Sequence, residues 1–157
     1  MPTLAQTGFA PVPAKKRSAL PIRKPPALSP ALFSDLIGKP FVDGGRGPAN
    51  YDCVGLVIEV AKRLGKTLPD YLSSETEFHA QMAADGAALA DLPRVGAATA
   101  GDIVLLRTGP AEHHVGVMVD RWRMIHAWKG IGVLVERINS PLWLRRILGF
   151  YSLGAAK

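Results

Sequence analysis

The chain has 157 residues, a length that suits one domain and is too short for two ordinary ones. Its composition is 48% hydrophobic and 20% charged, which excludes a wholly disordered chain, and its single cysteine excludes an intrachain disulfide framework. Nineteen Lys and Arg against thirteen Asp and Glu give a net charge of +6, which suits many polyanions and selects none of them.

The first segment, residues 1–28, is rich in Pro and Lys and poor in large apolar residues. Such a composition favours an extended chain and cannot build a core of its own. We expect a basic arm that is either disordered or docks on a larger assembly, followed by one domain over residues 29–157. Prolines interrupt the basic N-terminus, so we expect no secretory signal. No apolar run approaches the roughly 18 residues of a membrane-spanning helix, so no membrane insertion is expected.

Three short helices are predicted in the first half of the chain. Ser29 followed by Pro30 is typical of a helix start. Asp52 can cap a second helix whose apolar positions recur every three or four residues. A capping-box pattern opens the third helix. The expected helices are residues 30–37, 53–64 and 74–84, and the first two end at Gly38 and Gly65.

From Gly101 onward the sequence changes to short apolar runs separated by turn residues, which predicts β-strands. Helices followed by an antiparallel meander are typical of an α+β domain. The expected strands are residues 102–107, 114–119, 123–128, 133–137 and 147–153.

The single cysteine, Cys53, stands where the second helix should begin. Unpaired backbone N–H groups at a helix N-terminus carry partial positive charge, which lowers the pKa of a thiol and favours the thiolate nucleophile. A lone cysteine beside Val54 is also compatible with simple packing, and taken alone it favours that interpretation. The histidines therefore decide between the two.

Two of the four histidines, His114 and His126, lie on neighbouring strands of one predicted hairpin. A short turn would bring their side chains together, so that one can act as general base toward a thiol while the other orients it. Strand alternation turns His113 to the opposite face, where we expect it at the surface. His79 is interpreted as an ordinary helix residue.

A zinc site is the alternative use of Cys53, His114 and His126, since all three are zinc-ligand types. No closely spaced ligand pair and no evident fourth ligand accompany them. The sequence therefore predicts neither a metal nor a cofactor.

Four segments resemble, in order, the motifs of the NlpC/P60 cysteine peptidases. They look like the family's Asp-Cys-Ser-Gly-Leu signature, its Pro-Gly-Asp-Leu strand, its His-Val-Gly-Ile segment and its segment with the third catalytic residue. One such motif is weak evidence, whereas four in order are strong. The resemblance covers about Phe33 to Tyr151. The segments are Tyr51-Asp52-Cys53-Val54-Gly55-Leu56-Val57, Gly101-Asp102-Ile103-Val104-Leu105-Leu106, His114-Val115-Gly116-Val117 and Ile125-His126-Ala127.

The resemblance implies a papain-like fold in which N-terminal helices, including the Cys53 helix, pack on an antiparallel sheet carrying the two histidines. It implies hydrolysis of amide bonds in peptidoglycan stem peptides, with Cys53 as nucleophile, His114 as base and His126 as orienting residue. Asp52 would contact the substrate through an ammonium group, and Tyr51 or a backbone N–H, including that of Cys53, would donate a hydrogen bond to the oxyanion. Asp52 can also serve as the helix cap alone.

Two positions depart from the family pattern. The family usually places a Tyr that helps to hold the oxyanion where this chain has Phe41, and losing one such donor can lower the rate about 100-fold or more. Val54 replaces a Ser that can help to bind a free stem-peptide amine, which removes the sequence support for that preference.

The C-terminal half resembles, more narrowly, the small NlpC/P60 proteins encoded in phage and gene-transfer-agent tail modules. This implies cytoplasmic synthesis, carriage to the cell wall on a virion or phage-like tail, and docking of the arm on tail proteins. The segments that carry this resemblance are residues 123–127, 130–133 and 141–146.

Three alternatives to a tail-borne peptidase remain. A structural tail-tip protein with the same fold and little catalysis is favoured by Phe41. A related cysteine-dependent acyltransferase or amidase would differ only in the bond cut or in the acyl acceptor. Binding of nucleic acid is supported only by the basic arm, without interleaved aromatic residues, and is not expected.

Overall fold

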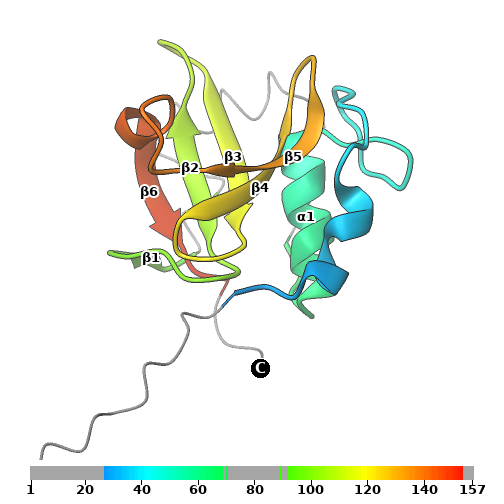
Figure 1. Ribbon diagram of the computed structural model, residues 1–157, viewed down its shortest axis with the longest axis horizontal. Helices are drawn as coiled ribbons and strands as arrows, with labels where there is room; N and C mark the ends of the chain where they lie inside the picture. The colour runs from blue at the N-terminus through cyan, green and yellow to red at the C-terminus, as the bar shows by residue number, and fades with distance from the viewer. Residues whose placement is uncertain (1–26, 69, 71–88, 90–91, 154–157) are drawn as a thin grey trace, which may run out of the picture.

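The computed structural model describes residues 27–68, 70, 89 and 92–153. Within these residues one α-helix, α1 (Cys53–Arg63), packs against a six-stranded antiparallel sheet (Figure 1). The predicted α+β class is confirmed for this part of the chain. The strand order is β1-β6-β2-β3-β4-β5, and the strands are β1 (Arg94–Val95), β2 (Ile103–Arg107), β3 (His113–Met118), β4 (Arg123–Trp128), β5 (Gly132–Arg137) and β6 (Ile147–Tyr151).

The predicted meander is formed by β2, β3, β4 and β5, which pair with their neighbours in chain order. All five expected strands are present, with ends that differ by no more than two residues from the predicted ones. The last strand, β6, returns to pair with β2, and the two-residue strand β1 pairs with β6. Two residues carry no measurable alternation, which is why β1 was not predicted.

The predicted second helix is confirmed as α1. Its first turn is capped by Asp52, whose carboxylate accepts a hydrogen bond from the backbone N–H of Gly55 at 2.7 Å. Leu64 is the C-cap, and Gly65 follows with a φ of +73°, a left-handed conformation that glycine adopts without strain. Leu56 and Val60 are fully buried and hold the helix on the sheet.

The predicted helix over residues 30–37 is wrong in type. The structure has two 3₁₀ turns, η1 (Pro30–Leu32) and η2 (Ser34–Leu36), and Phe33 between them departs from helical geometry with a φ of −145°. Short helices gain little from their own hydrogen bonds, so the burial of Phe33 and Leu36 in the core decides the path of this segment. Ser29 makes no side-chain cap. The predicted helix over residues 74–84, including His79, and residues 1–26 of the arm lie outside the described residues.

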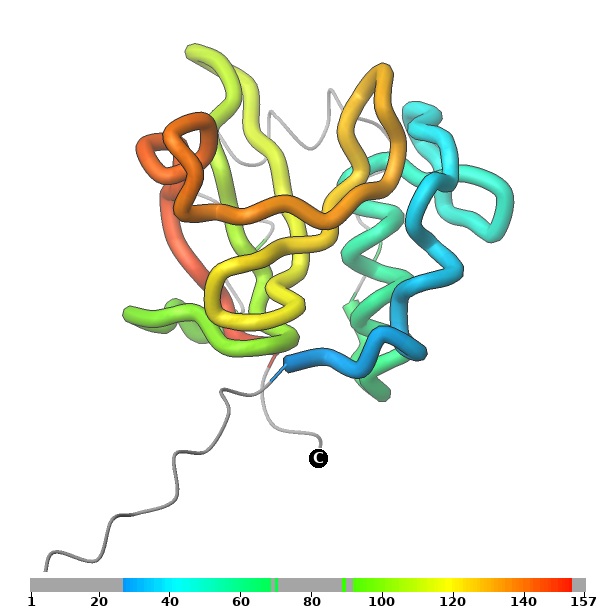
Figure 2. The backbone as a smooth tube through the Cα atoms, viewed as in Figure 1, coloured from blue at the N-terminus to red at the C-terminus, as the bar shows by residue number. Residues whose placement is uncertain are grey.

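The two faces of the sheet build two separate cores. On the face toward α1, apolar side chains of the strands pack against the helix. The opposite face is covered by the connection between β5 and β6, which crosses the sheet because β6 lies beyond β2 (Figure 2). Ile138 and Trp143 of this crossing segment, residues 138–146, pack on Met118 and Met124. None of the described helices is long and apolar enough to span a bilayer.

Candidate active site

Cys53 is the first residue of α1 and is 6% exposed. The carboxylate of Asp52 holds this helix end in place through three hydrogen bonds. Its Oδ1 accepts from the N–H of Gly55 and, at 2.8 Å, from Nη1 of Arg46, and its Oδ2 accepts from the N–H of Gly44 at 2.9 Å. Asp52 therefore ties the loop over residues 44–46 to the turn that carries the thiol. Its predicted contact with a substrate ammonium stays a prediction.

The close approach of this loop also explains a glycine of the cysteine segment. A Cβ atom at Gly55 would overlap the carbonyl oxygen of Gly45, so no larger residue fits there without moving the loop. Arg46 extends the contact outward, since its Nε donates to Asp70 at 2.7 Å. The start of α1 is thus fixed from two directions, by a cap and by a packed loop.

Tyr51 is buried, with 2% of its surface exposed, and belongs to the core between α1 and the sheet. Isolated β-bridges link its backbone to Phe41 and Arg46. A Cβ atom at Gly47 would overlap the Tyr51 hydroxyl, which places that hydroxyl against the backbone of the loop. Burial raises the pKa of Tyr51. Its predicted contact with the substrate stays a prediction.

His114 on β3 and His126 on β4 lie side by side, as the hairpin length predicted. Nε2 of His114 is 2.8 Å from Nδ1 of His126, and the ring planes are 77° apart. The two residues are 5% and 0% exposed. Gly116 makes room for the second ring, because a Cβ atom there would lie 3.2 Å from Cβ of His126.

The thiol and the first histidine meet at one cavity of about 270 Å³. Cys53 reaches it from the start of α1 and His114 from the start of β3. Phe41 lines the same cavity, so the residue that replaces the family's tyrosine shares this cavity with the thiol but has no hydroxyl. The other lining residues are Thr108, Glu112, His113, Ala127, Trp128 and Lys129.

His113 was expected at the surface, and this expectation is wrong, because the residue is only 7% exposed. Its strand, β3, lies in the middle of the sheet between β2 and β4. Both faces of β3 are covered, one by α1 and the other by the crossing segment. A side chain that alternates away from His114 is therefore buried as well.

Two further candidate site residues, Glu136 and Trp143, were not identified from the sequence. Oε2 of Glu136 on β5 lies 2.7 Å from Nε2 of His126, and it accepts a hydrogen bond at 3.2 Å from the indole N–H of Trp143. Burial lowers the pKa of His126, while the neighbouring carboxylate of Glu136 acts in the opposite direction. The alternation of β5 shows on which face of the sheet Glu136 lies. Only the register of β5 against β4 shows that this face brings Glu136 to His126.

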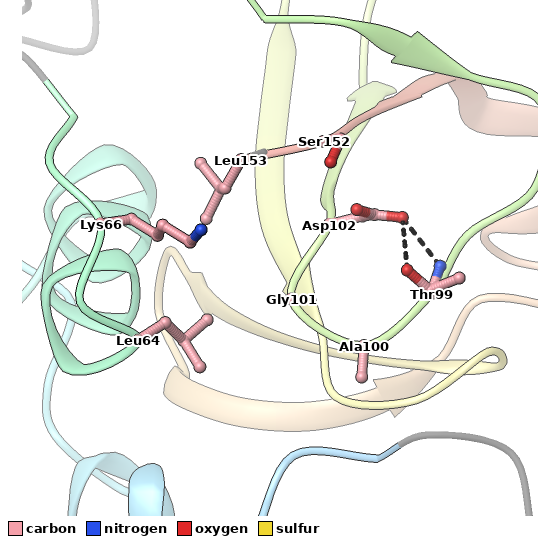
Figure 3. A pocket seen from close by; sticks show the side chains of 8 residues that line it. All are labelled: Leu64, Lys66, Thr99, Ala100, Gly101, Asp102, Ser152 and Leu153. Carbon is pink, nitrogen blue, oxygen red and sulfur yellow. Dashed lines mark hydrogen bonds between the residues drawn. The ribbon is translucent and has the colours of Figure 1, made fainter. Parts of the chain in front are cut away.

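The Gly101-Asp102 segment contributes to the fold at a different place. Asp102 lines a second cavity of about 280 Å³, together with Leu64, Lys66 and Ser152 (Figure 3). One oxygen of its carboxylate accepts hydrogen bonds from the N–H and the hydroxyl of Thr99, at 2.8 and 3.1 Å. Asp102 therefore shapes the turn that leads into β2, and none of Cys53, His113, His114 and His126 is among the described residues that line this cavity.

The zinc alternative does not fit the geometry of the two histidines. Nε2 of His114 and Nδ1 of His126 point at each other, so these atoms do not face a common ion. Among residues 27–68, 70, 89 and 92–153 there is no group of three His, Cys, Asp or Glu side chains arranged to hold a metal.

Comparison with known sequences agrees with the motifs. The model of the NlpC/P60 family matches residues 38–152. The chain is 31% identical over 116 residues to a probable endopeptidase p60 of Listeria seeligeri, covering 73% of this chain and 20% of the relative. It is 26% identical over 115 residues to the murein DD-endopeptidase MepS/murein LD-carboxypeptidase of Escherichia coli K12, covering 73% of this chain and 55% of the relative. The chain thus spans about a fifth to about half of the length of these relatives.

Comparison with solved structures shows the same fold. NlpC2 from Trichomonas vaginalis superposes with a TM-score of 0.59 at 21% identity, covering 78% of this chain and 44% of that one. The NlpC/p60 domain of the peptidoglycan hydrolase SagA superposes with a TM-score of 0.54 at 23% identity, covering 78% of this chain and 93% of that domain. One helix packed on an antiparallel sheet is therefore shared with these proteins.

Proposed function

Because the chain belongs to the NlpC/P60 family, we propose that it is a cysteine peptidase that hydrolyses amide bonds in peptidoglycan stem peptides. One observation carries the proposal. Cys53 at the start of α1 and His114, which is hydrogen-bonded to a buried second imidazole, line the same cavity. The relatives include a murein endopeptidase, which supports the substrate class.

In the first half of the reaction the thiol becomes the nucleophile. His114 takes the proton from Sγ of Cys53, which leaves a thiolate and an imidazolium. The thiolate attacks the scissile carbonyl carbon, and the carbonyl π electrons move to the oxygen. Backbone N–H groups of the first turn of α1, including that of Cys53, donate hydrogen bonds to this oxyanion, aided by the positive end of the helix dipole.

In the second half the acyl group leaves as an acid. The His114 imidazolium gives its proton to the leaving amine as the C–N bond breaks, and a thioester remains on Cys53. His114 then takes a proton from a water molecule, and the resulting hydroxide attacks the thioester carbonyl. The C–S bond breaks, which releases the carboxylic acid and the Cys53 thiolate, and the proton on His114 returns to the sulfur. His126 holds the ring of His114 in position throughout.

The thioester is the intermediate that tests this proposal. A synthetic stem peptide is mixed with the protein, the reaction is quenched in acid, and the intact protein is weighed by mass spectrometry. We expect an added mass equal to the acyl part of the peptide, located on Cys53, the single cysteine of the chain. The Cys53→Ala variant should show neither the added mass nor cleavage. Undiminished cleavage by Cys53→Ala would overturn the proposal.

We also propose that a phage or phage-like tail carries the peptidase to the cell wall, with residues 1–28 attached to tail proteins. The support is the resemblance of residues 123–127, 130–133 and 141–146 to tail-module proteins, together with the basic composition of the arm. In a density gradient of purified particles, we expect the full chain to co-sediment with tails and a variant lacking residues 1–26 to stay behind. A full chain found only in the soluble fraction would contradict tail carriage.

A structural tail-tip protein with weak or no catalysis is the second candidate. It is favoured by Phe41, which lines the thiol cavity without the family's hydroxyl. Particles assembled with Cys53→Ala separate the two functions. If the protein is only a structural component, particles with Cys53→Ala should cross the cell wall as well as wild-type particles. If it is a peptidase, these particles should fail to cross the wall.

A further inference from the structure

A line of hydrogen bonds runs from the crossing segment to the proposed base. The indole N–H of Trp143 lies 3.2 Å from Oε2 of Glu136, the same oxygen lies 2.7 Å from Nε2 of His126, and Nδ1 of His126 lies 2.8 Å from Nε2 of His114. Trp143 and both histidines are at least 95% buried. The side chain of Glu136, in the middle of the line, is 33% exposed and is its most accessible member.

The donor and acceptor roles of the indole and the carboxylate are fixed, and those of the two imidazoles follow from them. An indole N–H can only donate, and a carboxylate at neutral pH can only accept, so Oε2 of Glu136 is an acceptor. Nε2 of His126 must then carry a hydrogen and donate it to Glu136. In a neutral imidazole the other nitrogen is an acceptor, so Nδ1 of His126 accepts from an N–H on Nε2 of His114. The lone pair of His114 is therefore on Nδ1.

We propose that Glu136, held by Trp143, is a positioning residue that fixes the tautomers of His126 and His114 and so keeps the basic lone pair of His114 on Nδ1. This inference rests on the proposed function, in which His114 takes the proton of Cys53. Nε2 of His114 faces His126, so that transfer would take place at the other ring nitrogen, Nδ1.

The negative charge of Glu136, like its hydrogen bond, supports His114 as the base. When His114 accepts the proton it becomes an imidazolium, and its Nε2–H remains a donor to His126. His126 is polarised in turn by the carboxylate, so the new positive charge is stabilised through the ring between them. Burial lowers the pKa of His126 and favours its neutral form, which can accept at Nδ1. A protonated His126 would donate there and oppose the hydrogen of His114.

The aromatic packing shields the two histidine rings of the line from water. The rings of Trp128 and Trp143 meet edge to face with centroids 5.2 Å apart. Trp128 lies 5.0 Å from the ring of His114, and Trp143 lies 5.4 Å from that of His126. Hydrogen bonds enclosed in this way are stronger than exposed ones. The crossing segment thus contributes both a cover and the donor that fixes the direction.

The tautomers are measured directly by long-range ¹H–¹⁵N correlation spectra of the histidine rings in the full chain at neutral pH. We expect His114 and His126 to be protonated on Nε2 in the wild type, and both tautomers to be populated in Glu136→Ala. Glu136→Gln, which keeps the shape and the oxygen acceptor, should retain the wild-type tautomers. A wild-type His126 protonated on Nδ1, or unchanged tautomers in Glu136→Ala, would overturn the proposal.

Alkylation of Cys53 by iodoacetamide gives a second readout, since the chain has one cysteine. We expect Glu136→Ala to slow alkylation at neutral pH by about 10-fold, and Glu136→Gln, which lacks only the charge, to fall between Glu136→Ala and the wild type. The matched control is Glu59→Gln, the same change on α1, where Glu59 pairs with Arg63 at 2.8 Å. It should react at the wild-type rate. A wild-type rate for Glu136→Ala would overturn the proposal.

Neither readout requires cleavage of peptidoglycan, so the two proposals fail separately. If the tautomers and the alkylation rate depend on Glu136 but the protein cleaves no stem peptide, the proposed function alone is refuted. If the protein cleaves stem peptides but its histidine tautomers do not change in Glu136→Ala, the positioning role alone is refuted.

Discussion

Nε2 of His114 and Nδ1 of His126 lie 2.8 Å apart across the boundary between β3 and β4, with both rings shielded from solvent. This contact makes the two imidazoles one unit, because the orientation of the first ring depends on the second. The same unit is joined to β5 through Glu136. Side chains of three consecutive strands of the meander are therefore joined in one hydrogen-bonded group.

The two histidines should differ in their effect on activity. We expect His114→Ala to lower kcat/KM by about 10²- to 10⁴-fold, because it removes the proton acceptor itself. His126→Ala should lower it less, since the base remains and only its support is lost. Steady-state kinetics on a stem peptide checks both variants. Equal losses would contradict the division of roles.

Phe41 gives a gain-of-function prediction. It lines the cavity that Cys53 and His114 also line, so Phe41→Tyr adds a hydroxyl to the wall of this cavity. One oxyanion donor is commonly worth about 100-fold in kcat, and we expect an increase toward that value. Phe41→Leu is the control, because it changes the apolar surface without adding a donor. A rate for Phe41→Tyr no higher than that of the wild type would show that the hydroxyl does not reach the oxyanion.

Gly116 should be required for the histidine pair. A Cβ atom there would lie 3.0 Å from the carbonyl oxygen of Ile125 and 3.2 Å from Cβ of His126. Gly116→Ala should therefore lower the free energy of unfolding by about 1–3 kcal/mol and reduce kcat. The control is Gly96→Ala, where a Cβ atom meets nothing within 4 Å. Urea unfolding should separate the two variants, and equal stability of both would contradict the packing argument.

Burial of His126 predicts a loss of stability in mild acid. Its pKa is lowered by burial from the ordinary value of 6.5, so the unfolded chain binds the proton more readily than the folded one. Stability is then complete above pH 6.5 and falls as the pH drops from there toward the folded pKa. We expect the free energy of unfolding to decrease between pH 7.5 and pH 5.5 in the wild type, and to decrease less in His126→Gln. The same pH dependence in both proteins would contradict this assignment.

Much of the framework could be predicted from the sequence because it depends on local patterns. The cap at Asp52 and the glycine at position 65 define α1, and alternating runs define β2 to β5. The meeting of His114 and His126 followed from a hairpin of suitable length. These features depend on periodicity and on turn residues, which a single sequence shows.

The remainder depends on relationships between distant segments. Glu136 pairs with Met124 across β4 and β5, and only this register reveals that its side chain reaches His126. Trp143 lies in a connection without periodicity, so nothing in the sequence indicates that it crosses the sheet. The burial of His113 follows from cover on both faces of β3, which alternation alone does not predict.

Mass spectrometry of digested peptidoglycan tests the proposal that Cys53 hydrolyses a peptide bond of the cell wall. Purified peptidoglycan is incubated with the wild type or with Cys53→Ala, and the soluble fragments are sequenced. We predict new stem-peptide fragments from the wild type alone, whose new ends identify the bond. No new fragments from the wild type, with circular dichroism showing that both proteins are folded, would contradict the claim.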